Sequence, residues 1–122
     1  MFVWMQGNSF TRIATIYPGN ITLNTPCLRY FNGVKWCLIG IDRTDKKIAI
    51  KLASNEDLNK NKFMPEVLNK VSAGKSYVRI SNKNIISEIS KMLGKKCNGD
   101  KFIVSFDDKE NQIIIDLNNS IS

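Results

Sequence analysis

Histidine is missing altogether from this chain of 122 residues. It is the commonest general base and metal ligand, so its absence removes the usual starting point for acid–base or metal chemistry. The nearest substitute is a carboxylate cluster at Asp107, Asp108 and Glu110. Those residues lie between two apolar segments, where a turn calls for them anyway. We therefore expect a protein that is not an enzyme, with no catalytic residue, no metal site and no cofactor.

Cysteine is scarce, with three residues at Cys27, Cys37 and Cys97 and no C-x-x-C pair. An odd and widely spaced set argues against a disulfide framework and against a zinc site. Cys27 lies near an expected helix start, where the helix dipole could lower its pKa. The alternative is that Cys27 is a small buried apolar residue, and we favour this interpretation. The cysteines fit a reducing cytosol.

Long hydrophobic runs are also lacking. No segment approaches the roughly 20 apolar residues that a membrane helix needs. The apolar start Met1–Met5 gives way to polar residues at Gln6, before a secretory signal could form. We expect a cytoplasmic protein without a membrane partner, in which Phe2, Trp4 and Met5 pack on the domain or on a partner.

Acidic residues are few: eleven stand against eighteen lysines and arginines, for a formal net charge of +7. Such an excess in a small domain raises the question of a nucleic-acid partner. AT-rich codons offer a second explanation, because lysine, asparagine and isoleucine are all abundant. Residues 1–53 hold seven basic and two acidic residues, which predicts that the basic surface belongs mostly to the first half.

What the chain does contain is an internal repeat. A short alternating strand at 21–24 runs into Thr25-Pro26, a cap followed by a first-turn proline, and a short helix is expected there. Apolar strands at 36–41 and 47–52 then enclose a polar turn. The order in the first half is strand, helix, hairpin.

The second half has the same order. Its strands are expected at residues 78–81, 102–106 and 112–117. The two hairpins match without gaps, because six residues separate Asp42 from Ile48 and six separate Asp107 from Ile113. The helix of the second half is about two turns longer. Its apolar spacing predicts one buried face. The residues expected to be buried there are Ile85, Ile89 and Met92.

We expect one domain over residues 1–122. Its parts are repeat one at 9–52, a polar linker at 53–62 and repeat two at 63–117. Each repeat also gains a leading strand, at 9–16 and 63–71, ahead of a glycine turn. A unit of about 45 residues is marginal alone and would expose its apolar faces, so the two units should pair.

The order of leading strand, glycine turn, short strand, helix and hairpin resembles the AbrB-like swapped-hairpin family of transcription regulators, including its two-copy MraZ-type relatives. The second half carries the better match. Its matching segments are Val71–Lys75, Val78–Ser81, Met92–Gly94, Gly99–Lys101 and the Asp107 hairpin. The resemblance implies a β-rich α+β fold, a pseudodimeric barrel of two interleaved units that is a monomer or a homodimer.

AbrB-like proteins bind DNA through basic residues on their leading strands and glycine turns. The matching positions here hold Arg12, Asn20, Lys70, Lys75 and Arg79. The family's Gly-Arg is replaced by Gly19-Asn20 and Gly74-Lys75, and the Asp-x-x-x-Arg motif of MraZ-type helices is absent. These departures favour contact with phosphates over readout of bases.

Two functional classes remain open. One is an AbrB-like transcription regulator that contacts the phosphates of duplex DNA through a basic face. The other is a non-catalytic protein-interaction module, such as a small phage or mobile-element protein that docks on a host complex. Four aromatics near the basic positions, Tyr17, Tyr30, Phe31 and Tyr77, could stack on bases as in single-strand binders. Such residues also plug barrel ends, which is the interpretation we favour.

Overall fold

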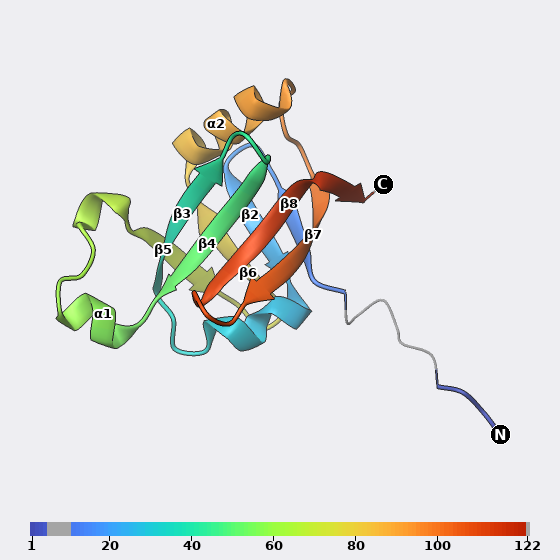
Figure 1. Cartoon of the computed structure of the whole chain (residues 1–122), viewed down its shortest axis with the longest axis horizontal. Helices are drawn as coiled ribbons and strands as arrows, with labels where there is room; N and C mark the ends of the chain where they lie inside the picture. The colour runs from blue at the N-terminus through green and yellow to red at the C-terminus, as the bar shows by residue number, and fades with distance from the viewer. Residues whose placement is uncertain (5–10, 122) are drawn as a thin grey trace.

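The computed structural model describes residues 1–4 and 11–121 (Figure 1). Expectations for Met5 and for residues 9 and 10 lie outside that part of the chain. The strands are β1 (Ile13–Ile16), β2 (Asn20–Asn24), β3 (Trp36–Asp42), β4 (Lys47–Ala53), β5 (Asn69–Ala73), β6 (Tyr77–Ser81), β7 (Asp100–Asp107) and β8 (Gln112–Ile121). The helical segments are the 3-10 helices η2 (Thr25–Phe31) and η3 (Pro65–Val67) and the α-helices α1 (Asn55–Asn59) and α2 (Lys83–Leu93).

The eight strands close into an antiparallel barrel in the order β1-β2-β6-β5-β3-β4-β8-β7. The expected β-rich α+β class is therefore correct. The strand pairing is symmetric between the two halves of the sequence. If β1, β2, β3 and β4 each change places with β5, β6, β7 and β8, every pair of neighbouring strands becomes another pair in the barrel or itself. The pair β1–β7 becomes β5–β3, and the pairs β2–β6 and β4–β8 each become themselves.

The register of the strand pairs has the same symmetry, because residues at equivalent positions lie opposite each other. In the turn before each short strand, the amide of Tyr17 donates to the carbonyl of Asn20 and that of Gly74 to the carbonyl of Tyr77, at 2.9 and 2.8 Å. Counted from these turns, Thr22 and Arg79 occupy equivalent positions. They lie directly opposite each other across β2 and β6.

The two hairpin turns also share one geometry. Asp42 Oδ1 accepts hydrogen bonds from the amides two and three residues later, both at 3.0 Å, and Asp107 Oδ1 does the same at 3.1 and 3.3 Å. Counted from these aspartates, Ala49 and Ile114 are equivalent, and they too lie opposite each other, across β4 and β8. The carboxylate cluster at Asp107 thus has a structural task in its turn.

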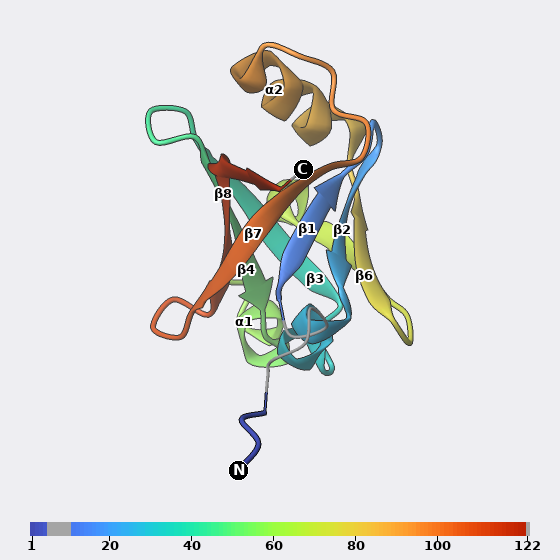
Figure 2. The ribbon, with the colours of Figure 1, turned by 90° about the vertical axis from the view of Figure 1, so that its right-hand side faces the viewer.

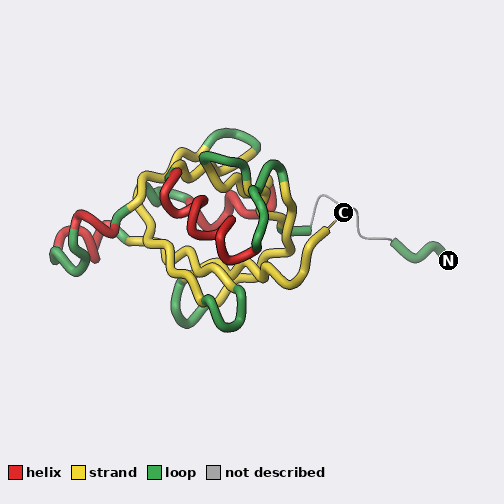
Figure 3. The backbone as a smooth tube through the Cα atoms, turned by 90° about the horizontal axis from the view of Figure 1, so that it is seen from above, coloured by secondary structure: helices red, strands yellow, loops and turns green. Residues whose placement is uncertain are grey.

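The core is aliphatic, because alternate residues of every strand point inward. Its fully buried side chains include Ile16, Leu23, Ile48, Ile50, Ile80, Ile113 and Ile115. Helix α2 covers one end of the barrel and η2 lies at the other (Figure 2). A view along the barrel shows α2 across the opening (Figure 3).

Helix α2 largely agrees with its predicted pattern. Ile89 is fully buried, as expected, whereas Ile85 and Met92 are only half-buried against the core. Ile86 is the second buried residue of the helix, because it is Ile86 and Ile89 that face into the barrel. Asn82 Oδ1 accepts from the amide of Ile85 at 3.1 Å, which caps the start of the helix.

Several predicted boundaries are wrong. The second leading strand begins at Asn69 and not at Phe63, because Pro65 starts the 3-10 helix η3. The linker contains α1, and its signal was visible in the sequence: Ser54 and Asp57 form a capping box. Strand β8 continues to Ile121, past the expected end of repeat two. Among the described residues no helix is long and apolar enough to cross a membrane.

Candidate nucleic-acid interface

The barrel wall divides into two halves of four consecutive strands. We call β1, β2, β6 and β5, residues 11–24 and 68–82, the leading half. We call β3, β4, β8 and β7, residues 36–53 and 100–121, the hairpin half. Figure 1 views the molecule from the side of β4 and β8, and Figure 2 from the side of β7 and β1.

Charge is segregated between these halves. The leading half contains four basic residues and no aspartate or glutamate, whereas the hairpin half contains six basic and seven acidic residues. Most of the net positive charge still belongs to residues 1–53, as expected, but the wall without carboxylates is not confined to them. Because β2 pairs with β6, the carboxylate-free wall takes strands from both halves of the sequence.

A row of outward-facing polar side chains crosses the leading half and reaches the neighbouring strand β7. Residues that lie opposite each other on neighbouring strands share a face of the sheet. The row consists of Lys101, Thr15, Thr22, Arg79 and Ser72. Hydroxyls and cations of this kind bind phosphate oxygens. Asp100, which precedes Lys101, is engaged by Lys95, and this contact lowers the pKa of the Asp100 carboxyl.

A shallow pocket of about 340 Å³ lies in the same face. Its lining residues are Tyr17, Asn20, Thr22, Tyr77 and Arg79. The guanidinium of Arg79 lies 5.1 Å from the centre of the Tyr77 ring. The hydroxyl of Thr22 donates to Asn20 Oδ1 at 2.8 Å. The pocket therefore combines two aromatic rings, a cation and an amide.

Of the predicted site residues, the structure brings Asn20 and Arg79 together in this pocket. Lys70 is exposed on β5, on the outward side with Ser72, and Lys75 is exposed in the adjoining β5–β6 turn. These four positions share one face. Thr22 lies in the centre of this face and was not predicted as a site residue. Its place between two apolar residues of an alternating strand does indicate an outward side chain.

Arg12 lies apart from that face. Its guanidinium is 5.8 Å from the centre of the Tyr30 ring and donates a hydrogen bond to the Tyr30 hydroxyl. Arg12 has the same parity along the strand as Ala14 and Ile16, which point into the barrel. Its side chain therefore secures the η2 end of the barrel.

The aromatic candidates separate into two pairs. Tyr30 stacks on Phe106 with ring centres 4.1 Å apart, and Phe31 is buried, so this pair plugs the barrel end as we favoured. Tyr17 and Tyr77 are instead 40% and 39% exposed beside the pocket. For them the preferred interpretation was wrong.

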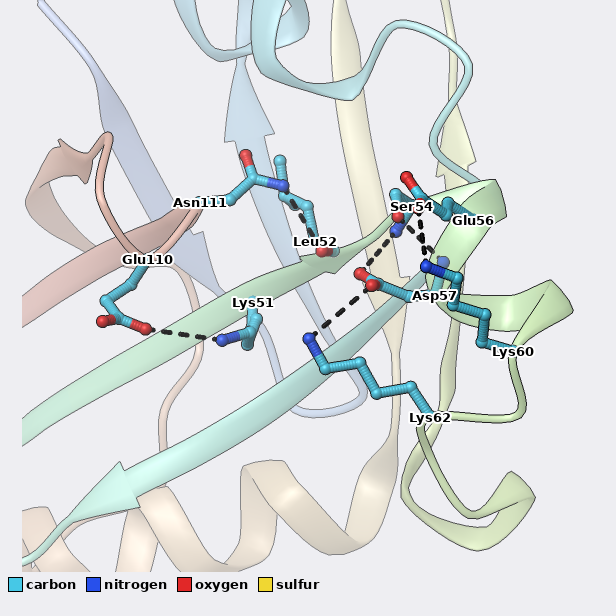
Figure 4. Close-up of polar contacts among 9 residues, drawn as sticks. All are labelled: Lys51, Leu52, Ser54, Glu56, Asp57, Lys60, Lys62, Glu110 and Asn111. Carbon is cyan, nitrogen blue, oxygen red and sulfur yellow. Dashed lines mark hydrogen bonds and ion pairs between the residues drawn. The ribbon is translucent and has the colours of Figure 1, made fainter.

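The hairpin half and the adjoining α1 carry their charges differently (Figure 4). Lys51 Nζ lies 3.5 Å from Glu110 Oε2, and Lys62 Nζ lies 3.7 Å from Asp57 Oδ1. A hydrogen bond with Ser54, with help from Lys62, lowers the pKa of Asp57. These lysines already face carboxylates. Within the described chain, Lys70, Lys75 and Arg79 take part in no ion pair. The same is true of Lys46, Lys47, Lys101 and Lys109 in the hairpin half, so the two halves differ in their carboxylates and not in unpaired cations.

The three thiols are buried and free. Burial raises the pKa of Cys27 to about 11, although the positive charge of Arg12 acts to lower it. Burial raises the pKa of Cys37 to about 12. Burial also raises the pKa of Cys97. The preferred interpretation of Cys27 as a small core residue is confirmed.

The fold and this face together define an eight-stranded antiparallel barrel with a carboxylate-free basic wall. Comparison of the chain with protein-family models, with curated proteins and with solved structures gives no match.

Proposed function

We propose that the chain is an AbrB-like swapped-hairpin protein, with two interleaved units in one chain, that acts as a transcription regulator by binding duplex DNA. The swapped-hairpin assignment is supported by the strand pairs, which are unchanged when the two units are exchanged. It is also supported by the register, since Thr22 lies opposite its equivalent Arg79 and Ala49 opposite Ile114.

The absence of carboxylates from residues 11–24 and 68–82 is the observation that carries DNA binding. A phosphate backbone approaching this wall meets Lys70, Lys75 and Arg79 without a competing ion pair in the described chain. The outward hydroxyl of Ser72 beside Arg79 adds a neutral donor. Contacts of this type position a duplex and carry no base information by themselves.

Fluorescence anisotropy with a labelled duplex of mixed sequence tests this proposal. The variant Lys70→Glu, Lys75→Glu, Arg79→Glu reverses the charge of the leading half. The matched control reverses three exposed lysines elsewhere, at Lys47, Lys60 and Lys109. Both variants have the same net charge, so a difference between them reports position alone.

The parent protein and the control should bind at low salt and lose affinity steeply as salt rises, because neutralised phosphates release counterions. The leading-half variant should lose binding. Equal affinities of the two variants, or no binding by the parent, would contradict the proposal. Circular dichroism of each variant verifies folding.

The second candidate, a protein-interaction module, is favoured by the outer face of the hairpin half. A pocket of about 340 Å³ there is lined by residues that include Leu38, Gly40 and Ala49, beside Val67, which is 47% exposed. Phe2 and Trp4 are 86% and 89% exposed and are a second apolar feature. If the parent binds no DNA, Phe2→Ser with Trp4→Ser is the first variant to compare in partner-binding assays.

A further inference from the structure

We infer that the pocket between Tyr17 and Tyr77 holds unpaired bases, so that the leading half also binds single-stranded nucleic acid. This inference rests on the proposed function, because it uses the same carboxylate-free face. It goes further in assigning the pocket a ligand of its own.

The two tyrosines lie at opposite ends of the pocket. Tyr17 belongs to the β1–β2 turn, which leads into the first residue of β2, whereas Tyr77 lies opposite Asn24, the last residue of β2. Each ring is about two-fifths exposed. The Tyr77 ring lies over Gly74, where an added Cβ would be 3.8 Å from the ring atoms. Exposed rings on a basic surface are the platforms on which single strands stack their bases.

Between the rings lie the groups that a nucleotide needs. Asn20 Oδ1 accepts a hydrogen bond from the Thr22 hydroxyl at 2.8 Å. Among the described residues Asn20 Nδ2 donates no hydrogen bond, so it can donate to a base. The guanidinium carbon of Arg79 lies over the Tyr77 ring, 5.1 Å from its centre. A guanidinium placed there puts a phosphate-binding cation beside an aromatic ring.

The shape of the site favours a single strand over a duplex for this pocket. In a duplex the base faces are stacked on one another, so a duplex on this wall would leave both tyrosine rings without a partner. An unpaired strand can place base faces on the rings and a phosphate beside Arg79. The pocket volume, about 340 Å³, leaves room for such a segment.

Anisotropy with labelled oligothymidylate and with a duplex of equal length separates the two modes. The variant Tyr17→Leu, Tyr77→Leu keeps apolar side chains but removes the aromatic faces. Trp4→Leu is the control, because Trp4 is an aromatic residue that is 89% exposed and lies outside the leading half. Tyr17→Phe, Tyr77→Phe keeps both rings and should bind like the parent, which guards against a folding defect.

We expect the leucine pair to weaken oligothymidylate binding by about tenfold or more, since the two lost base stacks together are worth at least that factor. The leucine pair should keep the duplex affinity of the parent, and Trp4→Leu should bind both nucleic acids like the parent. Unchanged oligothymidylate affinity in the leucine pair would overturn the inference. So would a parent that binds the duplex but not oligothymidylate, although the proposed function would then stand. A parent that binds only oligothymidylate would support the inference and contradict duplex binding, and a parent that binds neither would contradict both.

Discussion

The leading half and the hairpin half have the same interior and different exteriors. Inside, both contribute fully buried aliphatic residues, such as Leu23 from β2 and Ile50 from β4. Outside, the leading half presents hydroxyls and cations without any carboxylate, whereas the hairpin half presents apolar residues such as Leu38 and seven carboxylates among its cations. The barrel therefore needs only the interior pattern, and the exterior of each half is free to serve a separate purpose.

A second difference lies within the leading half. Equivalent positions on the two short strands hold Thr22 and Arg79, and the positions two residues earlier hold Asn20 and Tyr77. Two identical chains would place the same residue at both positions. Joining both units in one chain therefore allows a pocket with an amide at one side and a tyrosine and an arginine at the other, which a symmetric homodimer cannot build.

Both halves should contribute to one shared hydrophobic core. Leu23→Ala and Ile50→Ala each remove a fully buried side chain, one from each half. Each should lower the free energy of unfolding by about 2–5 kcal/mol in denaturant titrations. The transition should stay cooperative for both. A loss below about 0.5 kcal/mol for either residue would show that its half does not share the core.

A smaller effect concerns how α2 is attached to each half. Asn82 caps α2 and also donates from Nδ2 to Asn69 Oδ1 on β5 at 2.7 Å, so it ties the helix to the leading half. Asn82→Ala should cost about 1 kcal/mol. The link to the hairpin half is the exposed ion pair between Arg43 and Glu88 at 3.0 Å, and Arg43→Ala should cost under about 0.5 kcal/mol. Thermal unfolding of both variants compares the two stability losses. A larger loss for Arg43→Ala than for Asn82→Ala would show that α2 is held mainly by the hairpin half.

The smallest effect compares the two hairpin turns. Lys46 and Asn111 have left-handed backbones with φ of 54° and 52°. Lysine is poorly suited to this region and asparagine tolerates it. Lys46→Gly should therefore stabilise the protein by about 0.5 kcal/mol, whereas Asn111→Gly should leave stability nearly unchanged. Equal changes in chemical denaturation would mean that the two turns do not differ in strain.

Much of the fold was predictable because strand and turn signals are local. The gapless hairpins, the cap at Asn82 and the end of α2 at Gly94 depend on alternation, capping and a glycine with positive φ, all of which are visible in a short stretch of sequence. The error at Phe63–Leu68 has the same origin. Weak alternation favoured a strand there, but Pro65 lacks an amide hydrogen and starts a 3-10 turn.

The site was less predictable, because it depends on which strands become neighbours. The sequence places Lys70 and Arg79 in one repeat, but only the pairing of β2 with β6 brings Thr22 and Asn20 beside them. Arg12 lies apart from the face for a different reason. Its parity puts it with the inward residues of β1, so that it meets Tyr30 and not the outer face.

The central claim is that nucleic acid binds the leading half and not the hairpin half. A titration of the ¹⁵N-labelled protein with duplex DNA, followed in amide proton–nitrogen spectra, tests it residue by residue. Perturbations should gather in β1, β2, β5 and β6, with the turns at 17–19 and 74–76 and with Lys101, and should fade as salt is added. Perturbations centred on β3, β4 and β8, or none at low salt, would contradict the account.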